Sequence, residues 1–211
     1  MAEKLQEKSC ERFTAELAST APIPGGGSVT ALLGALSAAL CAMAANLSSP
    51  RAKDPLVGEA LKAAGEQAGQ LRLRALAMID ADAEAFLPLS RAYGLPKDTP
   101  GRAETLRQLS LQAAEIPLEA LRLCGEIVEL LELLLSRASS LLQSDVGCAA
   151  AVCRAAVDCA AMNVWVNTGL FPEDPQVQEY EKEAKDLHET LLRRTDAVTA
   201  AVRERLVKEW P

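Results

Sequence analysis

Aromatic residues are scarce in this sequence, and the scarcity restricts the fold classes open to it. Phe, Trp and Tyr make up 3% of the 211 residues, whereas apolar residues as a whole make up 49%. Sheet sandwiches and barrels draw on aromatic and β-branched side chains, so Ala and Leu must fill the core here. We therefore predict an all-α protein, with residues 1–211 forming a single domain that is a bundle of about six to eight helices.

Metal-ligating residues are also few. The chain has one histidine, His188, which lies in a charged stretch and is predicted to be a solvated surface residue. None of the six cysteines belongs to a C-x-x-C pair. Zinc sites need clusters of such ligands, so we expect no metal site. Free cysteines pack as small hydrophobes, and we expect core thiols in a reducing, cytoplasmic compartment.

The chain has no basic run, and we expect neither a signal peptide nor a membrane span. Its net charge is -7, which argues against nucleic acid as a partner. Residues 1–12 are polar and carry charges of both signs. Residues 29–47 form a long apolar run, but Ala, Ser and Gly dominate it, so we expect a buried helix and no membrane partner.

Helical spacing, prolines and glycines divide the chain into helices joined by short breaks. Ser28 is predicted to cap one helix, Thr99 and Pro100 to begin another, and Pro117 to kink or restart it. The predicted helices cover residues 2–19, 28–47, 56–92, 100–137, 144–167 and 176–208.

A glycine-rich loop precedes the long apolar helix. Its residues are Pro24, Gly25, Gly26, Gly27 and Ser28. Free backbone N–H groups at a helix start attract anions or polarised carbonyls. The loop lacks the lysine of a phosphate loop and the preceding strand of a dinucleotide fold, which argues against ATP and NAD. A tight turn between helices that needs glycine explains the loop equally well.

Asp82 lies in an apolar helical stripe that also contains Leu71, Ala75, Met78, Ala85 and Leu89. A carboxylate in such a stripe is costly to bury unless it is paired or used, and desolvation raises its pKa. A raised pKa suits a general acid or base near neutral pH. Asp82 is therefore the first catalytic candidate, whereas Asp80 and Glu84 on the adjacent face are explained by a surface acidic patch.

Three polar residues mark the helix predicted over residues 144–167. Asp145 in its first turn is favoured by the helix dipole, so capping alone explains it. Asn163 and Asn167 lie one turn apart on an apolar background. Their amides suit either the hydrogen-bonding edge of a pterin-like heterocycle or the end of a neighbouring helix. Arg154 and Asp158, four residues apart, are predicted to form a surface ion pair.

Segments spread over nearly the whole chain resemble one family, that of formiminotransferase-cyclodeaminases and methenyltetrahydrofolate cyclohydrolases. Each motif alone is weak, but their order and spacing together are specific. The matching segments are residues 13–18, 22–36, 43–47, 80–86, 95–99, 116–118, 144–147 and 163–167.

The resemblance implies an all-α homodimer or higher even oligomer, a tetrahydrofolate substrate, and no metal or redox cofactor. It places the catalytic acid at Asp80 or Asp82, and the stripe favours Asp82. It also implies that Pro24 to Ser28 line the folate pocket together with Asp145, Asn163 and Asn167, and that Lys97 binds substrate. Many members carry a lysine-rich run where this chain has Arg51 to Lys53, so binding of the folate tail there is expected to differ.

Two reactions are known in the family. Cyclohydrolases open 5,10-methenyltetrahydrofolate with water to give 10-formyltetrahydrofolate, and cyclodeaminases convert 5-formiminotetrahydrofolate to the methenyl compound and ammonia. We expect no transferase domain in a chain of 211 residues, which favours the cyclohydrolase. The alternatives are a cyclodeaminase, or a non-catalytic helical protein that binds folate or serves as a scaffold.

Overall fold

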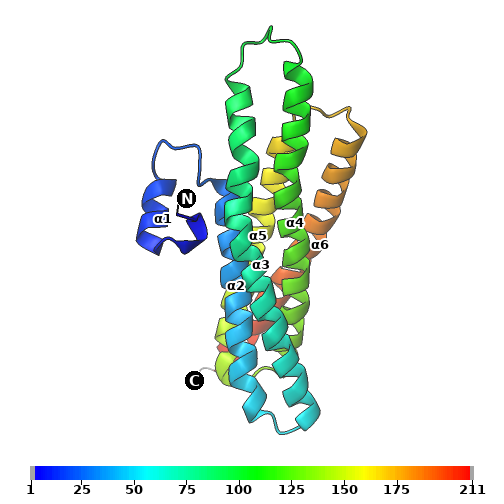
Figure 1. The fold of residues 1–211 in the computed structure, drawn as a ribbon. Coiled ribbons are helices and arrows are strands. Elements are labelled where there is room, and N and C mark those ends of the chain that lie inside the picture. The colour runs from blue at the N-terminus through cyan, green and yellow to red at the C-terminus, as the bar shows by residue number, and fades with distance from the viewer. Residues whose placement is uncertain (1–2, 210–211) are drawn as a thin grey trace.

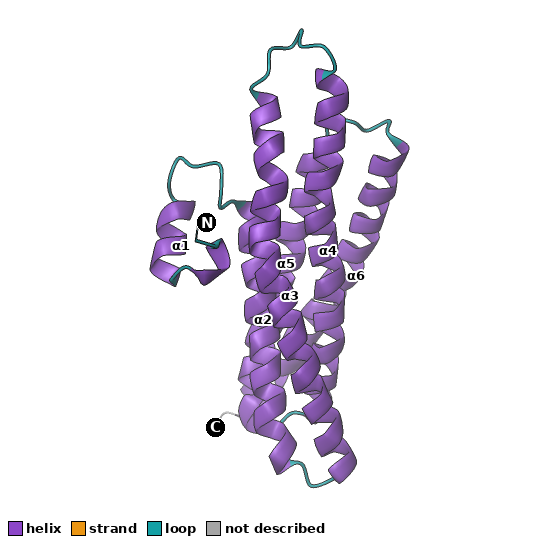
Figure 2. Cartoon of the chain, in the orientation of Figure 1, coloured by secondary structure: helices purple, strands orange, loops and turns teal. Residues whose placement is uncertain are grey.

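The computed structural model describes residues 3–209, which form helices and connecting loops without any strand (Figures 1 and 2). The prediction of an all-α bundle is therefore confirmed. The elements are η1 (Leu5–Glu7), α1 (Cys10–Leu17), α2 (Gly26–Ser48), η2 (Ser49–Arg51), α3 (Pro55–Tyr93), α4 (Arg102–Arg137), η3 (Ser140–Leu142), α5 (Gln143–Thr168) and α6 (Pro175–Glu209).

The helices from α2 to α6 run alternately up and down around a shared core (Figure 1). α2 packs against α3, α4 and α5, and α6 covers α4 and α5. Small residues permit these close contacts, since a Cβ added at Gly34 would already touch Ala75 and Leu123 at 3.7 Å. Ser37 Oγ donates a hydrogen bond of 2.9 Å to the carbonyl of Ala149, which sets the register of α2 against α5.

The predicted helix over residues 2–19 is divided, although residue 2 lies outside the described range. Ser9 begins a new helix, α1, because its side chain accepts a hydrogen bond from the Arg12 N–H. The backbone N–H groups of Leu5 and Gln6 donate to the carboxylate of Asp80. A long-range contact to α3 therefore replaces the continuous helix.

Two predicted helix starts are wrong. Gly25 is the N-cap of α2, and Ser28 lies inside the first turn, where its hydroxyl bonds a side chain of α3. α4 begins at Arg102 and not at Pro100, with Gly101 as its cap at a φ of 74°. α4 continues through Pro117 as one helix, so the predicted restart does not occur.

The predictions for cysteine and histidine are only partly correct. All six cysteines are free, and Cys41, Cys124 and Cys153 are buried, whereas Cys10 and Cys148 are exposed. His188 is not a solvated residue, because its side chain is only 19% exposed and bonds Asp158 at 2.9 Å. Its ring also meets Trp165 edge-on. The predicted pair of Arg154 and Asp158 forms at 3.0 Å.

Within residues 3–209, two helical segments are long and apolar enough to cross a membrane by length and composition, α2 with η2 (Gly26–Arg51) and η3 with α5 (Ser140–Thr168). The bundle buries 56% of the apolar window in the first and 44% in the second. The expectation of a buried helix over residues 29–47 therefore holds for one side of α2 only. Its other side is open, with Leu36 49% exposed.

Candidate active site

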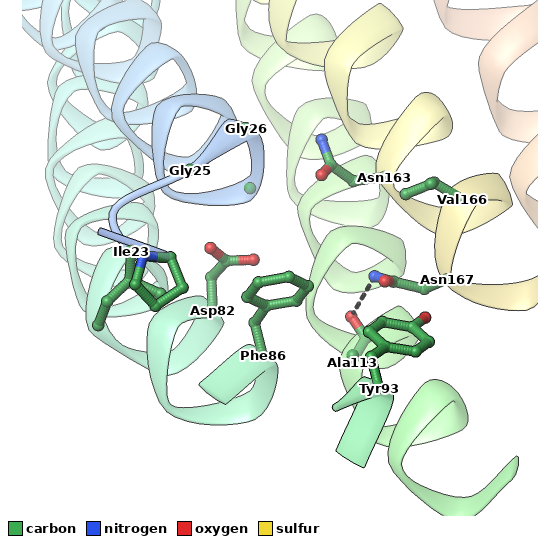
Figure 3. A pocket seen from close by; sticks show the side chains of 12 residues that line it. Ile23, Gly25, Gly26, Asp82, Phe86, Tyr93, Ala113, Asn163, Val166 and Asn167 are labelled. Carbon is green, nitrogen blue, oxygen red and sulfur yellow. Dashed lines mark hydrogen bonds between the residues drawn. The ribbon is translucent and has the colours of Figure 1, made fainter. Parts of the chain in front are cut away.

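A cavity of about 360 Å³ lies at the point where α2 begins. α3 and α5 continue past this level, and α4 closes the space behind them (Figures 1 and 3). The late start of α2 therefore leaves a hollow in the bundle. The cavity is lined by Pro22, Ile23, Gly25, Gly26, Gly27, Asp82, Phe86, Tyr93, Ala113, Asn163, Val166 and Asn167.

Asp82 projects from α3 toward the first turn of α2 (Figure 3). The hydroxyl of Ser28 donates a hydrogen bond of 2.9 Å to Asp82 Oδ2. Burial raises the pKa of Asp82, and the polar groups of Ser28 oppose that rise without cancelling it. The predicted stripe carboxylate is thus a partly buried group, and its pKa is shifted toward neutrality.

Only glycine fits at position 27, because the first turn of α2 lies so close to the Asp82 side chain. A Cβ at that position would lie 1.9 Å from Asp82 Oδ1, far inside van der Waals contact. The glycine therefore lets the helix start approach the carboxylate, which is the physical reason for at least one glycine in the loop.

Two amides face Asp82 from α5. Asn163 Nδ2 donates to the carbonyl of Cys159 at 2.8 Å, and Asn167 Nδ2 donates to the carbonyl of Ala113 at 3.0 Å. Each nitrogen thus has one of its two hydrogens bonded to a backbone oxygen. The amide oxygens of the two residues are the groups left to accept hydrogen bonds from a molecule in the cavity.

The remaining walls are largely apolar. Phe86 and Tyr93 follow Asp82 along α3 and line the cavity with Ile23 and Val166. Sequence reasoning missed both aromatic residues, although their spacing from Asp82 places them on the same side of the helix. The chain has only 2 Trp, 2 Tyr and 3 Phe. Two of these few aromatic residues follow Asp82 at helical spacing, and this pattern could have predicted them as site residues.

Asp80 lies outside this cavity. Its Oδ1 accepts the Leu5 N–H at 2.7 Å and its Oδ2 accepts the Gln6 N–H at 3.3 Å. It borders a different hollow of about 310 Å³, between the N-terminal segment and α3. In this structure Asp80 anchors η1, and only Asp82 reaches the cavity.

Pro24 and Ser28 are buried beside residues that line the cavity, whereas Asp145, Lys97 and the segment from Arg51 to Lys53 are not among the lining residues. Asp145 and Asn163 are 18 residues apart on one helix, which is about 27 Å along its axis. The segment from Arg51 to Lys53 follows the far end of α2, about 35 Å from Gly26. Lys97 is exposed in the turn between α3 and α4. Within one chain these positions do not share the cavity.

The arrangement suits proton transfer to a flat heterocycle. A carboxylate with a raised pKa exchanges protons readily near neutral pH. Amide oxygens accept from ring N–H groups, and aromatic side chains cover ring faces. Among residues 3–209 no cluster of three or more His, Cys, Asp or Glu side chains is placed to hold a metal ion.

Known proteins with similar sequences and structures point to one family. The sequence profile of the family Formiminotransferase-cyclodeaminase matches residues 9–186. The chain is 35% identical over 184 residues to the methenyltetrahydrofolate cyclohydrolase of Methylorubrum extorquens, covering 85% of this chain and 88% of that one. It is 28% identical to the formimidoyltransferase-cyclodeaminase of Mus musculus, covering 82% of this chain but only 32% of the mouse protein.

The fold agrees with the sequence comparison. The crystal structure of formiminotetrahydrofolate cyclodeaminase from Thermotoga maritima superimposes with a TM-score of 0.82 at 25% identity, covering 94% of this chain and 99% of that one. The motif resemblance, the sequence matches and the fold agree with one another. The chain belongs to the formiminotransferase-cyclodeaminase family.

Proposed function

We propose that the chain hydrolyses 5,10-methenyltetrahydrofolate to 10-formyltetrahydrofolate, with Asp82 as the group that transfers protons. One observation carries the proposal: a carboxylate whose pKa is raised by burial stands in the cavity at the start of α2. The 35% identity to a cyclohydrolase supports this reaction over the others known in the family.

The cavity has groups that can bind the separate parts of a folate. A pterin ring carries N–H donors along one edge, and the amide oxygens of Asn163 and Asn167 are available to accept from them. Phe86 and Tyr93 offer ring faces to the heterocycle or to the aminobenzoyl group. Pro24 and Ser28 shape the loop behind Asp82, and Gly25 to Gly27 let the substrate approach the backbone closely.

The proposed hydrolysis needs only water as co-reactant and proton transfers. The methenyl carbon carries positive charge shared between N5 and N10, so a nearby carboxylate stabilises it. Water adds to this carbon while Asp82 accepts one proton from the water. The hydroxyl of the adduct then loses its proton as the bond from carbon to N5 breaks, and N5 takes a proton. The formyl group remains on N10, and no electron is exchanged, so the proposed chemistry needs no metal or redox cofactor.

The cyclodeaminase reaction is the second candidate, because the Thermotoga structure of that description superimposes over 94% of this chain. In that reaction N10 attacks the formimino carbon and loses a proton, and the leaving ammonia gains one. Asp82 serves both transfers in sequence.

The near-ultraviolet absorbance of the methenyl compound separates these candidates. Purified protein is added to 5,10-methenyltetrahydrofolate in one cuvette and to 5-formiminotetrahydrofolate in another. Enzyme-dependent loss of the signal in the first identifies a cyclohydrolase, and its appearance in the second identifies a cyclodeaminase. No change in either cuvette contradicts both proposals and leaves a binding or scaffold protein.

We also propose that the protein is a cytoplasmic homodimer. Six free cysteines suit a reducing compartment. The open apolar side of α2 supports dimerisation, because a lone soluble subunit rarely exposes such a continuous surface. Light scattering during gel filtration tests the dimer, and replacing Leu36 and Met43 by Asp is expected to give monomers.

A further inference from the structure

α4 carries a proline in its interior. Pro117 is buried, and the helix Arg102–Arg137 continues through it without a break. Proline is the least favourable residue in a helix interior, because it lacks a backbone N–H group and its ring crowds the carbonyl four residues earlier. The helix therefore contains an unfavourable residue at this point, and its consequence lies at the carbonyl that it leaves without a donor.

That carbonyl belongs to Ala113. In a regular α-helix it would accept a hydrogen bond from the N–H group of residue 117, and a proline has none. Ala113 lines the cavity and is only 3% exposed. An unpaired carbonyl in a buried position is costly, so this one needs a donor from outside α4.

Asn167 on α5 supplies the missing donor. Its Nδ2 atom donates to the carbonyl of Ala113 at 3.0 Å (Figure 3). The two residues are 54 positions apart in the sequence, and both line the cavity. The carbonyl that Pro117 leaves free is thus paired with an amide of the candidate active site.

This bond determines which end of the Asn167 amide faces the cavity. A carbonyl oxygen only accepts hydrogen bonds, so the NH2 end of the amide must point to Ala113. The Oδ1 end therefore points away from Ala113 and is presented to a molecule in the cavity. An N–H group at position 117 would pair the carbonyl within α4, and the amide would then be able to turn over.

Asn163 shows the contrasting case. Its Nδ2 atom donates to the carbonyl of Cys159, which lies four residues earlier on the same helix. That carbonyl also keeps the backbone N–H of Asn163 as its regular helical donor. The orientation of Asn163 is therefore set within α5, whereas the orientation of Asn167 depends on α4.

We propose that Pro117 is a positioning residue of the active site, because it leaves the Ala113 carbonyl free to hold the Asn167 amide with its oxygen toward the substrate. The cavity then favours a heterocycle edge that donates hydrogen bonds, such as a ring N–H or an amino group, over an edge that accepts them. The ligand part of this inference rests on the proposed folate substrate, whose pterin ring carries such donors.

Aspartate at position 167 tests the orientation, because it keeps the shape and the acceptor oxygen but has no NH2 group. With Pro117 in place, the new carboxylate meets a carbonyl that has no donor. With Pro117→Ala, the carbonyl is paired within α4, and an oxygen can still face the cavity. Repulsion between the new carboxylate and Asp82 is the same in both backgrounds and cancels in the comparison.

The measurement is KM for 5,10-methenyltetrahydrofolate at pH 8, where the new carboxylate is ionised. We expect Asn167→Asp to raise KM about 10-fold or more in the wild type. Relative to the Pro117→Ala parent, we expect the same exchange to raise KM no more than about 3-fold.

Thermal melts test the contact without any substrate. We expect Asn167→Asp to lower Tm by about 3 °C more with Pro117 than with Pro117→Ala, since only the first leaves a buried carbonyl unpaired. Pro117→Ala alone is expected to raise Tm, because alanine favours a helix, and to raise KM about 3-fold with kcat nearly unchanged. A purely structural role of Pro117 would not weaken substrate binding while stabilising the fold.

Two controls separate this contact from general effects. Pro88 is a second proline in a helix interior of the described chain, and Glu84, whose carbonyl it leaves free, is exposed on α3. Pro88→Ala is expected to keep the wild-type KM and to leave the effect of Asn167→Asp unchanged. Asn163→Asp is expected to change KM by the same factor with and without Pro117→Ala.

Equal effects of Asn167→Asp on KM in the two backgrounds overturn the proposal, and so do equal effects on Tm. If Asn167→Asp alone does not fold, recovery of the fold by Pro117→Ala supports the proposal, and a double variant that also fails to fold overturns it. Absence of turnover in the wild type refutes the proposed function instead, and the Tm comparison then decides by itself whether Pro117 orients Asn167.

Discussion

Replacing Gly27 by alanine is expected to displace the Asp82 carboxylate and to remove most of the activity. The added Cβ would lie 1.9 Å from Asp82 Oδ1, 2.5 Å from its Cγ and 2.8 Å from its Oδ2. All three atoms belong to a short side chain that Ser28 already holds in place. Either Asp82 rotates away from Ser28, or the first turn of α2 moves outward.

The size of the effect follows from two opposing terms. Overpacking of this kind costs about 1–3 kcal/mol, and the better helix propensity of alanine offsets about 1 kcal/mol. We expect a net loss of up to about 2 kcal/mol, or a Tm lower by up to about 8 °C. A shift of about 1 Å in a catalytic group costs about 100-fold in rate, so kcat is expected to fall by that factor while the protein remains folded.

Gly69→Ala is the matched control, because a Cβ at that position meets nothing within 4 Å. It is expected to keep its kcat and to gain up to about 1 kcal/mol of stability. The measurement is kcat from methenyl absorbance together with Tm from circular dichroism. If Gly27→Ala keeps the wild-type kcat, the contact between Asp82 and the start of α2 has no part in catalysis.

Three further predictions concern the carboxylates and their partner. Burial raises the pKa of Asp82, so the ionised form destabilises the fold, and wild-type stability falls as pH rises from the unfolded pKa of about 3.9 through the raised folded pKa. Asp82→Asn removes this loss, so thermal melts should show a higher Tm than wild type at neutral pH and a difference that shrinks in acid; a lower Tm at neutral pH contradicts the burial argument. Ser28→Ala deletes a hydrogen bond that lowers the pKa of Asp82, so the acid limb of the pH–kcat profile for methenyl hydrolysis should move to higher pH, and an unmoved limb would show that Asp82 is not the titrating group. Asp80→Ala frees the N–H groups of Leu5 and Gln6 and is expected to cost about 1 kcal/mol with kcat nearly unchanged; a large fall in kcat with an unchanged Tm would assign the catalytic role to Asp80.

Local patterns in the sequence predicted the helices well. The apolar stripe through Asp82 is correctly placed, since Leu71, Ala75, Met78 and Leu89 are all buried. Helix ends were less predictable where a distant group competes for a polar side chain. Ser28 has the chemistry of an N-cap, but Asp82 from another helix takes its hydroxyl. Capping propensity contains no information about such a partner.

The cavity itself could not be derived from sequence spacing. The cavity exists because α3 and α5 extend along the bundle beyond the point where α2 begins. It also depends on which turn of α3 lies beside Gly27. That register is set by tertiary packing between segments far apart in the chain. Phe86 and Tyr93 were missed although their spacing from Asp82 places them on the same side of α3, whereas Asn163 and Asn167 were found because they share a helix face. Asp145 lies in the first turn of the same helix, at the end opposite to Asn163 and Asn167. Family motifs alone do not show that these residues are so far apart.

The most direct test of the central claim compares wild-type protein with Asp82→Asn on 5,10-methenyltetrahydrofolate. Hydrolysis is followed by loss of the methenyl absorbance, and folate binding is measured separately by calorimetry. We predict enzyme-dependent hydrolysis by the wild type, and a variant that still binds folate without turnover. Equal turnover by the two proteins, or none by the wild type, would contradict the assignment of Asp82 as the proton-transfer group of a folate enzyme.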